Sequence, residues 1–186
     1  YASTIASQSV KVFQTYLTKR IRSLTDEHDE FVRKSYFGGR TEIFKPCFLQ
    51  TQDNEILSTF DVNSLYPAVM RENEFPGAVK CKTTKLDVDA IGFYDVDVRV
   101  PEMYVPPLGM VHGIFKRLIF PTGSFRGVFS TAELKYAMSL GVEVLKVHEG
   151  LIFRSAGFIF KDFINDIYEK RKRAGKESVD NVLCKL

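Results

Sequence analysis

The chain has 186 residues, 45% of them hydrophobic and 13% aromatic, with a formal net charge of +3 and a pI near 8.7. This composition excludes a disordered or low-complexity protein, and its weak basicity permits a polyanionic partner without requiring one. No stretch approaches the roughly 20 apolar residues of a membrane span, and three widely separated cysteines exclude a disulfide framework and favour a reducing intracellular compartment.

Hydrophobic spacing predicts a helix and then two strands in the first third of the chain. Apolar residues recur at helical spacing from about residue 4 to 20, and a polar, charged segment follows at 23–35. The glycine-bearing loop 36–40 leads into a strand-like run at 41–48, and a second such run covers 55–60. We expect this second strand to end at an acidic residue.

A short helix is predicted directly after that acidic residue. Asn63 or Ser64 can serve as its N-cap, and Pro67 falls in the first turn, where a missing N–H costs little. The helix should extend to about Arg71 and end before the Pro76-Gly77 pair. The free N–H groups of its first turn would then face the end of the preceding strand.

The middle of the chain alternates between strand and helix patterns. Alternation of apolar and polar residues over 94–100 predicts a strand with one face buried. A bent strand and turn are expected at 119–129, and a helix closed by a glycine at 131–140. A further strand is expected at 142–153, with Gly150 as a bulge or turn. This part of the chain therefore contributes most of the predicted strands.

The C-terminal part is predicted to be helical. Apolar residues recur at helical spacing from Phe160 to Ile167 and lead into the basic run 170–173. A glycine interrupts this helix, and another starts near residue 177. Because the chain begins with Tyr rather than Met and its last residues lie inside an apolar-periodic stretch, we expect it to be part of a longer protein.

Three motifs, in this order along the chain, resemble those of family B DNA polymerases. The sequence YFGGR at 36–40 resembles the YxGG loop between exonuclease and palm domains, and DVNSLYP at 61–67 resembles motif A. The helix at 160–172, followed by Lys185-Leu186, resembles the paired fingers helices, with the lysine opening motif B. The segment 120–127, like the flanks of the YFGGR loop, is similar to the protein-primed branch found in phages, linear plasmids and mobile elements.

The resemblance implies an α+β fold, a partial polymerase palm made of an antiparallel sheet with flanking helices, plus a fingers helical hairpin. Residues 1–35 would be the tail of the exonuclease domain and a linker, and 36–74 the palm with the YxGG loop and motif A. Palm strands and an insertion-like subdomain would occupy 75–153, and fingers helices truncated at motif B would occupy 154–186. The compartment would be the host cytoplasm, or the mitochondrion for a plasmid-encoded protein.

Motif A carries the predicted catalytic chemistry. Asp61 offers a carboxylate and Val62 a backbone carbonyl as oxygen ligands for Mg²⁺ or Mn²⁺. The N–H groups of Ser64, Leu65 and Tyr66, at a helix N-terminus, can hold phosphate oxygens of a dNTP. By resemblance, Tyr66 packs under the incoming sugar and selects deoxyribonucleotides. The competing interpretation of Asp61 is an ordinary N-cap or turn carboxylate.

Two cations are expected to contact the nucleotide. The resemblance places Arg171 and Lys185 on the two arms of the fingers hairpin, where they would offset charge on the triphosphate. The competing interpretation is a solvated helix, because acidic residues precede basic ones along 162–173, as the helix dipole favours in any exposed helix.

The YxGG loop is a candidate contact for template DNA. Its glycines allow backbone N–H groups to approach phosphates, while an aromatic ring stacks or packs. The alternative is a simple turn that enters a strand. The DNA-binding residues predicted in this loop are Tyr36, Gly38, Gly39 and Arg40.

The sequence YDVD at 94–97 imitates the second metal-binding motif of these polymerases, but it precedes Lys185 instead of following it. We therefore interpret Asp95 and Asp97 as the solvated face of a palm strand. With one catalytic carboxylate, the 186 residues alone are expected to be inactive.

The predicted parent is a DNA-directed DNA polymerase that adds dNTPs to a primer terminus on template-primer DNA by two-metal nucleotidyl transfer. A terminal protein would provide the priming hydroxyl. The first alternative is a non-catalytic nucleic-acid-binding or assembly module, either a split or a degenerate polymerase half. A polymerase primed by nucleic acid is the second alternative, and it differs only in its starter.

Overall fold

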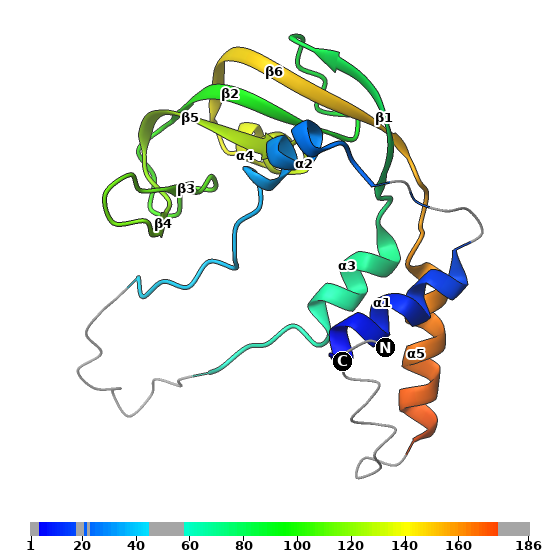
Figure 1. The fold of residues 1–186 in the computed structure, drawn as a ribbon. Coiled ribbons are helices and arrows are strands. Elements are labelled where there is room, and N and C mark those ends of the chain that lie inside the picture. The colour runs from blue at the N-terminus through cyan, green and yellow to red at the C-terminus, as the bar shows by residue number, and fades with distance from the viewer. Residues whose placement is uncertain (1–3, 18–20, 22, 45–57, 175–186) are drawn as a thin grey trace, which may run out of the picture.

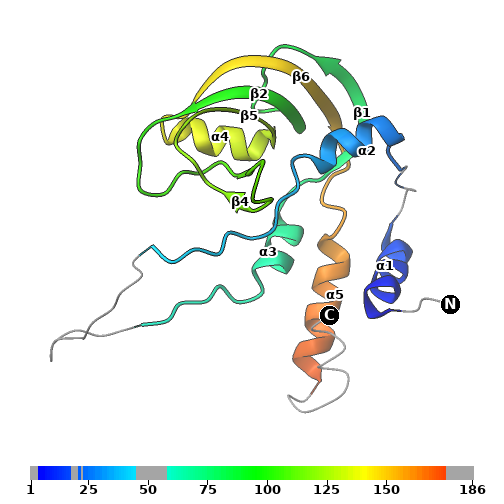
Figure 2. The same cartoon turned by 60° about the vertical axis from the view of Figure 1, so that its left-hand side comes forward.

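The computed structural model describes residues 4–17, 21, 23–44 and 58–174. They form a four-stranded antiparallel sheet with a helix on each face, and a separate group of three helices at one corner (Figures 1 and 2). None of the helices in these ranges is long and apolar enough to cross a membrane. The elements are α1 (Ile5–Tyr16), α2 (Asp26–Arg33), α3 (Leu65–Glu72), β1 (Pro76–Thr83), β2 (Gly92–Val100), β3 (Met110–Val111), β4 (Leu118–Ile119), β5 (Gly123–Ser130), α4 (Thr131–Ser139), β6 (Glu143–Ser155) and α5 (Lys161–Arg173).

The sheet has the strand order β1-β6-β2-β5, and β2 lies in its interior. Alternate residues of β2 are completely or almost completely buried, which confirms the strand predicted from the period-two pattern. They pack against two fully buried residues of α4, Leu134 and Ala137, and against Phe129 at the end of β5. One face of the sheet and α4 therefore form the core. The buried residues of β2 are Tyr94, Val96, Val98 and Val100.

Local sequence signals explain the position of α4. Ser130 accepts a hydrogen bond from the Glu133 N–H, and the Glu133 carboxylate accepts one from the Ser130 N–H, which is a complete capping box. The helix ends before Gly141, whose φ of +92° lies in the left-handed region that glycine adopts without strain. The predicted helix at 131–140 is confirmed.

The helix α2 was not predicted, because the segment 23–35 was interpreted as a polar linker. Thr25 accepts a hydrogen bond from the His28 N–H and caps a first turn that contains three acidic residues. An ion pair between Arg33 and Asp29, one turn apart, adds to it. Thr25 followed by acidic residues was a helix-start signal that could have identified α2.

The two strands expected before motif A are not present in the described residues. Residues 41–44 and 58–60 have no strand structure, and the remainder of both runs lies outside the described part of the chain. A β-branched or apolar run becomes a strand only when it finds a ladder partner. Phe60 is 91% exposed, and no described strand lies alongside it.

Gly150 is neither a turn nor the bulge itself. It pairs with Tyr94 of β2 and Thr83 of β1, and the nearby register shift lies between Glu149 and Val147. A Cβ atom on Gly150 would lie 2.3 Å from Cε1 of Tyr94. Glycine is required here because the buried tyrosine ring crosses the strand at this point.

The helices α1, α3 and α5 form the second part of the molecule. α3 packs against α5, and the Phe13 ring of α1 stacks on Phe160 with the ring centroids 4.5 Å apart. The Tyr16 hydroxyl of α1 donates a hydrogen bond to the Asp166 carboxylate of α5. The helix predicted between Phe160 and the basic run is confirmed, whereas the one expected near residue 177 lies outside the described residues.

Both α3 and α5 join the sheet at one corner. Pro76, the first residue of β1, pairs with Ser155, the last residue of β6. The Phe75 N–H donates to the Gly157 carbonyl at 3.1 Å, and the Ala156 N–H donates to the Phe75 carbonyl at 2.8 Å. These bonds fix the point at which the helical part leaves the sheet.

Candidate functional site

Motif A leads directly into α3. Residues 58–62 have no regular structure, and Ser64 adopts a left-handed conformation with φ 53° and ψ 45°. This conformation is uncommon for a residue with a side chain, and it turns the chain sharply into the helix at Leu65. Ser64 occupies the predicted N-cap position, but its side chain makes no capping hydrogen bond.

The N-terminus of α3 carries unused hydrogen-bond donors. The first bond of the helix runs from the Ala68 N–H to the Ser64 carbonyl, so the N–H groups of Leu65 and Tyr66 have no acceptor in the described part of the chain. The Leu65 side chain is 49% exposed and that of Tyr66 is 76% exposed. These backbone N–H groups can donate hydrogen bonds to an anionic ligand.

The predicted metal ligands precede these donors by three to five residues in the chain. Asp61 is exposed and takes part in no ion pair with the other described residues, and Val62 is 63% exposed. A carboxylate and a backbone carbonyl are hard oxygen donors that suit Mg²⁺ or Mn²⁺. The described ranges contain no group of three His, Cys, Asp or Glu side chains around a metal-sized space. The residues therefore fit part of a magnesium site, to which water and phosphate oxygens would add ligands.

Arg171 lies near the end of α5, the helix that packs against α3. It belongs to the four-residue basic run of the last turn, where cations are favoured by the helix dipole. One turn earlier, Asp166 pairs with Lys170 at 2.9 Å. The hydrogen bonds from Tyr16 and Lys170 lower the pKa of Asp166. Lys185, the other predicted triphosphate contact, lies outside the described residues.

The residues predicted to contact DNA in the YxGG loop differ in their surroundings. Tyr36 is 83% exposed, and apart from chain neighbours no described residue has an atom within 4 Å of where a Cβ on Gly38 or Gly39 would stand. Both glycines therefore leave the backbone open to a ligand. The Arg40 side chain, in contrast, is only 21% exposed.

The Arg40 guanidinium is held by the protein itself. It donates to the Pro106 carbonyl at 2.7 Å, pairs with Glu42, and lies over the Phe120 ring at 4.2 Å from the centroid. The Tyr104 hydroxyl donates to the Phe44 carbonyl at 3.1 Å in the same region. Arg40 thus fastens the loop 36–44 to the segment that carries β3 and β4.

The YDVD carboxylates are paired with side chains of neighbouring strands. Asp95 accepts two hydrogen bonds from Arg126, at 2.8 and 2.6 Å, and this guanidinium lowers the pKa of Asp95. Asp97 lies 2.8 Å from Nε2 of His148. Both face the side of the sheet opposite the core, as expected, but each has a side-chain partner: Asp95 forms an ion pair with Arg126, and Asp97 shares a hydrogen bond with His148. Arg126 and His148 could not be identified as partners without the strand register.

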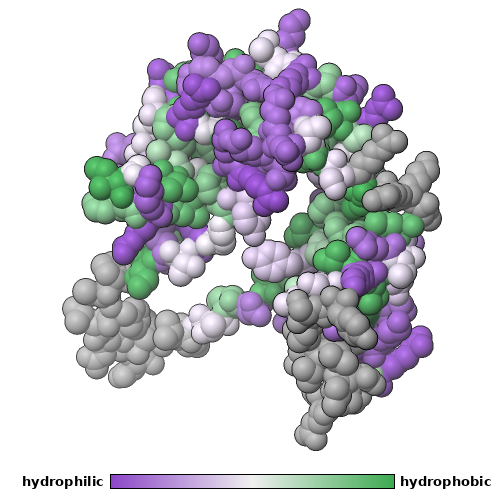
Figure 3. Space-filling model, viewed as in Figure 1, coloured by the Kyte–Doolittle hydropathy of each residue, from purple (hydrophilic) through white to green (hydrophobic). Residues whose placement is uncertain are grey.

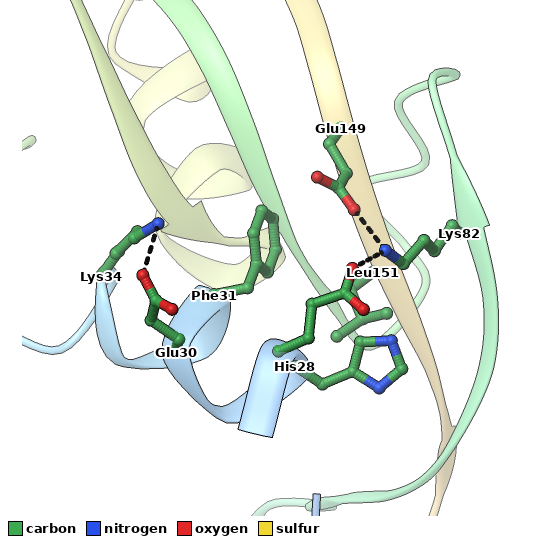
Figure 4. A pocket seen from close by; sticks show the side chains of 8 residues that line it. His28, Glu30, Phe31, Lys34, Lys82, Glu149 and Leu151 are labelled. Carbon is green, nitrogen blue, oxygen red and sulfur yellow. Dashed lines mark hydrogen bonds and ion pairs between the residues drawn. The ribbon is translucent and has the colours of Figure 1, made fainter. Parts of the chain in front are cut away.

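A pocket between α2 and the sheet, shown in Figure 4, is lined by a cluster of ion-paired side chains. Lys82 of β1 lies between Glu27 of α2 and Glu149 of β6, at 2.5 and 3.1 Å. The pocket is about 140 Å³, below the 300–1,000 Å³ usual for ligand sites. Its charged groups hold α2 on the sheet, and we assign it no ligand.

Comparison with known proteins identifies the family. A sequence profile described as DNA polymerase type B, organellar and viral, matches residues 1–186. A probable DNA polymerase of Neurospora intermedia is 29% identical over 199 residues, covering 98% of this chain and 20% of the relative. One of Podospora anserina is 29% identical over 161 residues, covering 83% of this chain and 12% of the relative.

Solved structures show the same fold. Phi29 DNA polymerase complexed with primer-template DNA and incoming nucleotide aligns with a TM-score of 0.71 at 24% identity, covering 98% of this chain and 34% of that chain. The phi29 enzyme complexed with single-stranded DNA aligns with a TM-score of 0.69 at 23% identity, covering 98% and 33%. This confirms the α+β polymerase fold, and the chain spans about a third of the phi29 enzyme. By its match over its whole length, this chain belongs to the organellar and viral type B DNA polymerases.

Proposed function

We propose that the chain is the palm-and-fingers portion of a DNA-directed DNA polymerase that adds dNTPs to a primer terminus by two-metal nucleotidyl transfer. The observation that supports this most is an exposed Asp61 a few residues before the α3 N–H groups that have no acceptor among the described residues, inside a chain that matches the polymerase family throughout. A terminal protein would supply the priming hydroxyl, as implied by the resemblance of the segment 120–127 and the flanks of the YFGGR loop to the protein-primed branch.

Each site residue has a distinct role in this proposal. The Asp61 carboxylate and the Val62 carbonyl hold a divalent cation, which supplies charge neutralisation and activation of the primer hydroxyl. The N–H groups of Ser64, Leu65 and Tyr66 bind triphosphate oxygens at the α3 N-terminus. The exposed Tyr66 ring lies at the same helix end, where it would pack under the sugar and exclude a 2′-hydroxyl.

The remaining predicted residues complete the nucleotide and DNA contacts. Arg171, on the helix packed against α3, and Lys185 would offset charge that builds on the leaving pyrophosphate. Tyr36, Gly38 and Gly39 offer an exposed ring and open backbone to the template. In this proposal Arg40 positions that loop, since its guanidinium already has protein partners.

The test measures binding of dATP by the 186-residue chain in the presence of Mn²⁺, by isothermal titration calorimetry. Asp61→Asn should weaken this binding about tenfold or more, because it removes the one charged oxygen ligand and costs about 1.4 kcal/mol or more. Asp89→Asn is the matched control, since Asp89 is also exposed and its one ion-pair partner among the described residues is Lys135. Equal affinity of wild type and Asp61→Asn would refute the metal role.

Primer extension separates the enzyme from the alternative of a binding module. The chain alone should incorporate no dNTP, because it carries a single candidate metal carboxylate. Metal-dependent dATP binding that requires Asp61 supports the polymerase. DNA binding without any Asp61-dependent nucleotide binding would instead favour a non-catalytic module, and robust extension by the chain alone would show that a second carboxylate is present.

A further inference from the structure

The turn between β3 and β4 has a conformation fixed by its own hydrogen bonds. The His112 N–H donates to the Arg117 carbonyl at 2.8 Å, and the Lys116 N–H donates to the His112 carbonyl at 2.9 Å. Nδ1 of His112 also accepts from the N–H groups of Ile114 and Phe115, both at 3.3 Å. A ring nitrogen that accepts two backbone donors ties the whole turn to one side chain.

This turn presents an aromatic ring to solvent. Phe115 is 70% exposed, yet its ring stacks on the His112 ring with centroids 4.8 Å apart and an interplanar angle of 26°. One face of the phenyl ring is therefore supported by the protein, and little conformational entropy remains to be lost when the other face binds a ligand. Figure 3 shows apolar side chains gathered at this end of the molecule.

Positive charge lies directly beside the ring. Lys116 and Arg117 are exposed, and neither forms an ion pair with another residue in the described part of the chain. Lys116 has a φ of +50°, so the turn brings the backbone back immediately after the aromatic residue. A stacked ring next to unpaired cations is the chemistry that binds a base and its phosphate together.

We propose that the turn 112–117 is a stacking site for single-stranded DNA, with Phe115 under an unpaired base and Lys116 and Arg117 on the adjacent phosphates. Single-stranded nucleic acid fits better than a duplex, because bases in a duplex are already stacked on each other. An apolar protein partner would fit less well beside two unpaired cations. This proposal rests on the proposed polymerase function for its relevance to template binding.

The position of the turn agrees with such a role. Arg40 of the YxGG loop contacts the Pro106 carbonyl and the Phe120 ring, which precede and follow the β3–β4 hairpin. The part of the loop 36–44 around Arg40 therefore lies beside the segment that carries the hairpin (Figure 1).

The test is fluorescence anisotropy with fluorescein-labelled oligothymidylate, the 186-residue chain and EDTA, which removes any contribution from a metal site. Phe115→Leu keeps an apolar side chain but removes the ring, and it should weaken binding about 5- to 100-fold, the range for loss of one base stack. Phe115→Tyr should bind within about twofold of wild type. Ile114→Ala is the control, because Ile114 is the apolar neighbour and is 82% exposed.

Charge is tested separately by salt dependence. Replacing both Lys116 and Arg117 by Ala should reduce the slope of log affinity against log salt by about 1.4, because each phosphate contact on a single strand contributes about 0.7. Thermal unfolding of each variant checks that the fold is kept. The same oligonucleotide annealed to oligodeoxyadenylate should bind with little dependence on Phe115.

Three outcomes would overturn the stacking site. The first is that the wild-type chain binds no oligothymidylate, and the second is that Phe115→Leu binds it as tightly as wild type does. The third is that Ile114→Ala loses as much affinity as Phe115→Leu, which would indicate general apolar docking of the kind a protein partner uses. Failure of the proposed function is read independently, from Mn²⁺-dependent dATP binding. If DNA affinity does not depend on the Phe115 ring while dATP binding still depends on Asp61, the stacking site is refuted and the proposed function is not.

Discussion

Replacing Gly150 by Ala tests whether the Tyr94 ring fixes the packing of β6 against β2. The new Cβ would lie 2.3 Å from Cε1 and 2.5 Å from Cδ1 of Tyr94. The ring cannot simply move away, since Tyr94 is completely buried and its hydroxyl accepts from the Asp87 N–H and donates to the Lys85 carbonyl, at 3.1 and 3.2 Å. Overpacking of this kind costs about 1–3 kcal/mol. For a chain of this size that corresponds to a fall in Tm of about 2–12 °C.

Urea unfolding followed by circular dichroism measures the effect. Gly113→Ala is the control, because no atom lies within 4 Å of its added Cβ, and its unfolding free energy should not fall. In a Tyr94→Leu background, the cost of Gly150→Ala should shrink by at least about 0.5 kcal/mol, because the two side chains share the same space. An unchanged urea midpoint for Gly150→Ala in the wild-type background would refute the reasoning.

Two further predictions concern charged side chains. Arg126 lowers the pKa of Asp95, so this pair stabilises the fold fully above the unfolded pKa of about 3.9, and its contribution is lost as the pH falls through the lower folded pKa. The difference in unfolding free energy between wild type and Asp95→Asn should thus be about 0.5–1 kcal/mol at pH 6 and shrink toward pH 3; a constant difference would contradict it. Arg40→Lys keeps the positive charge but not the planar guanidinium with its several donors. The loop 36–44 should therefore detach from the hairpin and be cut faster by chymotrypsin. An unchanged cutting rate would show that Arg40 does not hold the loop.

Elements with strong local signals could be predicted from the sequence. The alternation in β2, the capping box and closing glycine of α4, and the helical spacing after Phe160 each depend on residues close together in the chain. The helix α2 was missed because only Phe31 and Val32 give its eight residues an apolar face. Residues 58–60 were predicted to be part of a strand, but no described strand pairs with them.

The candidate site divides in the same way. The helix that begins in motif A could be predicted, because motif A is a continuous sequence, whereas the metal role of Asp61 stays a prediction. The internal partners of Arg40 could not, since its hydrogen bond to Pro106 spans 66 residues. Similarly, the pairing of Asp95 with Arg126 depends on the register of β2 against β5, which only the folded sheet shows. The turn at His112 could not be predicted either, because no sequence pattern indicated that Nδ1 of His112 accepts hydrogen bonds from the N–H groups of Ile114 and Phe115.

The pairing of Pro76 with Ser155 has a consequence for how such a chain can change in evolution. Since the backbone leaves α3 and returns to α5 at neighbouring positions, the loops between the intervening strands can grow or shrink without altering the distance that the two helices must bridge. A tight turn in place of the entire sheet would still connect them. Insertions and deletions in related genes should therefore accumulate between these two residues, while the spacing across the junction itself stays fixed.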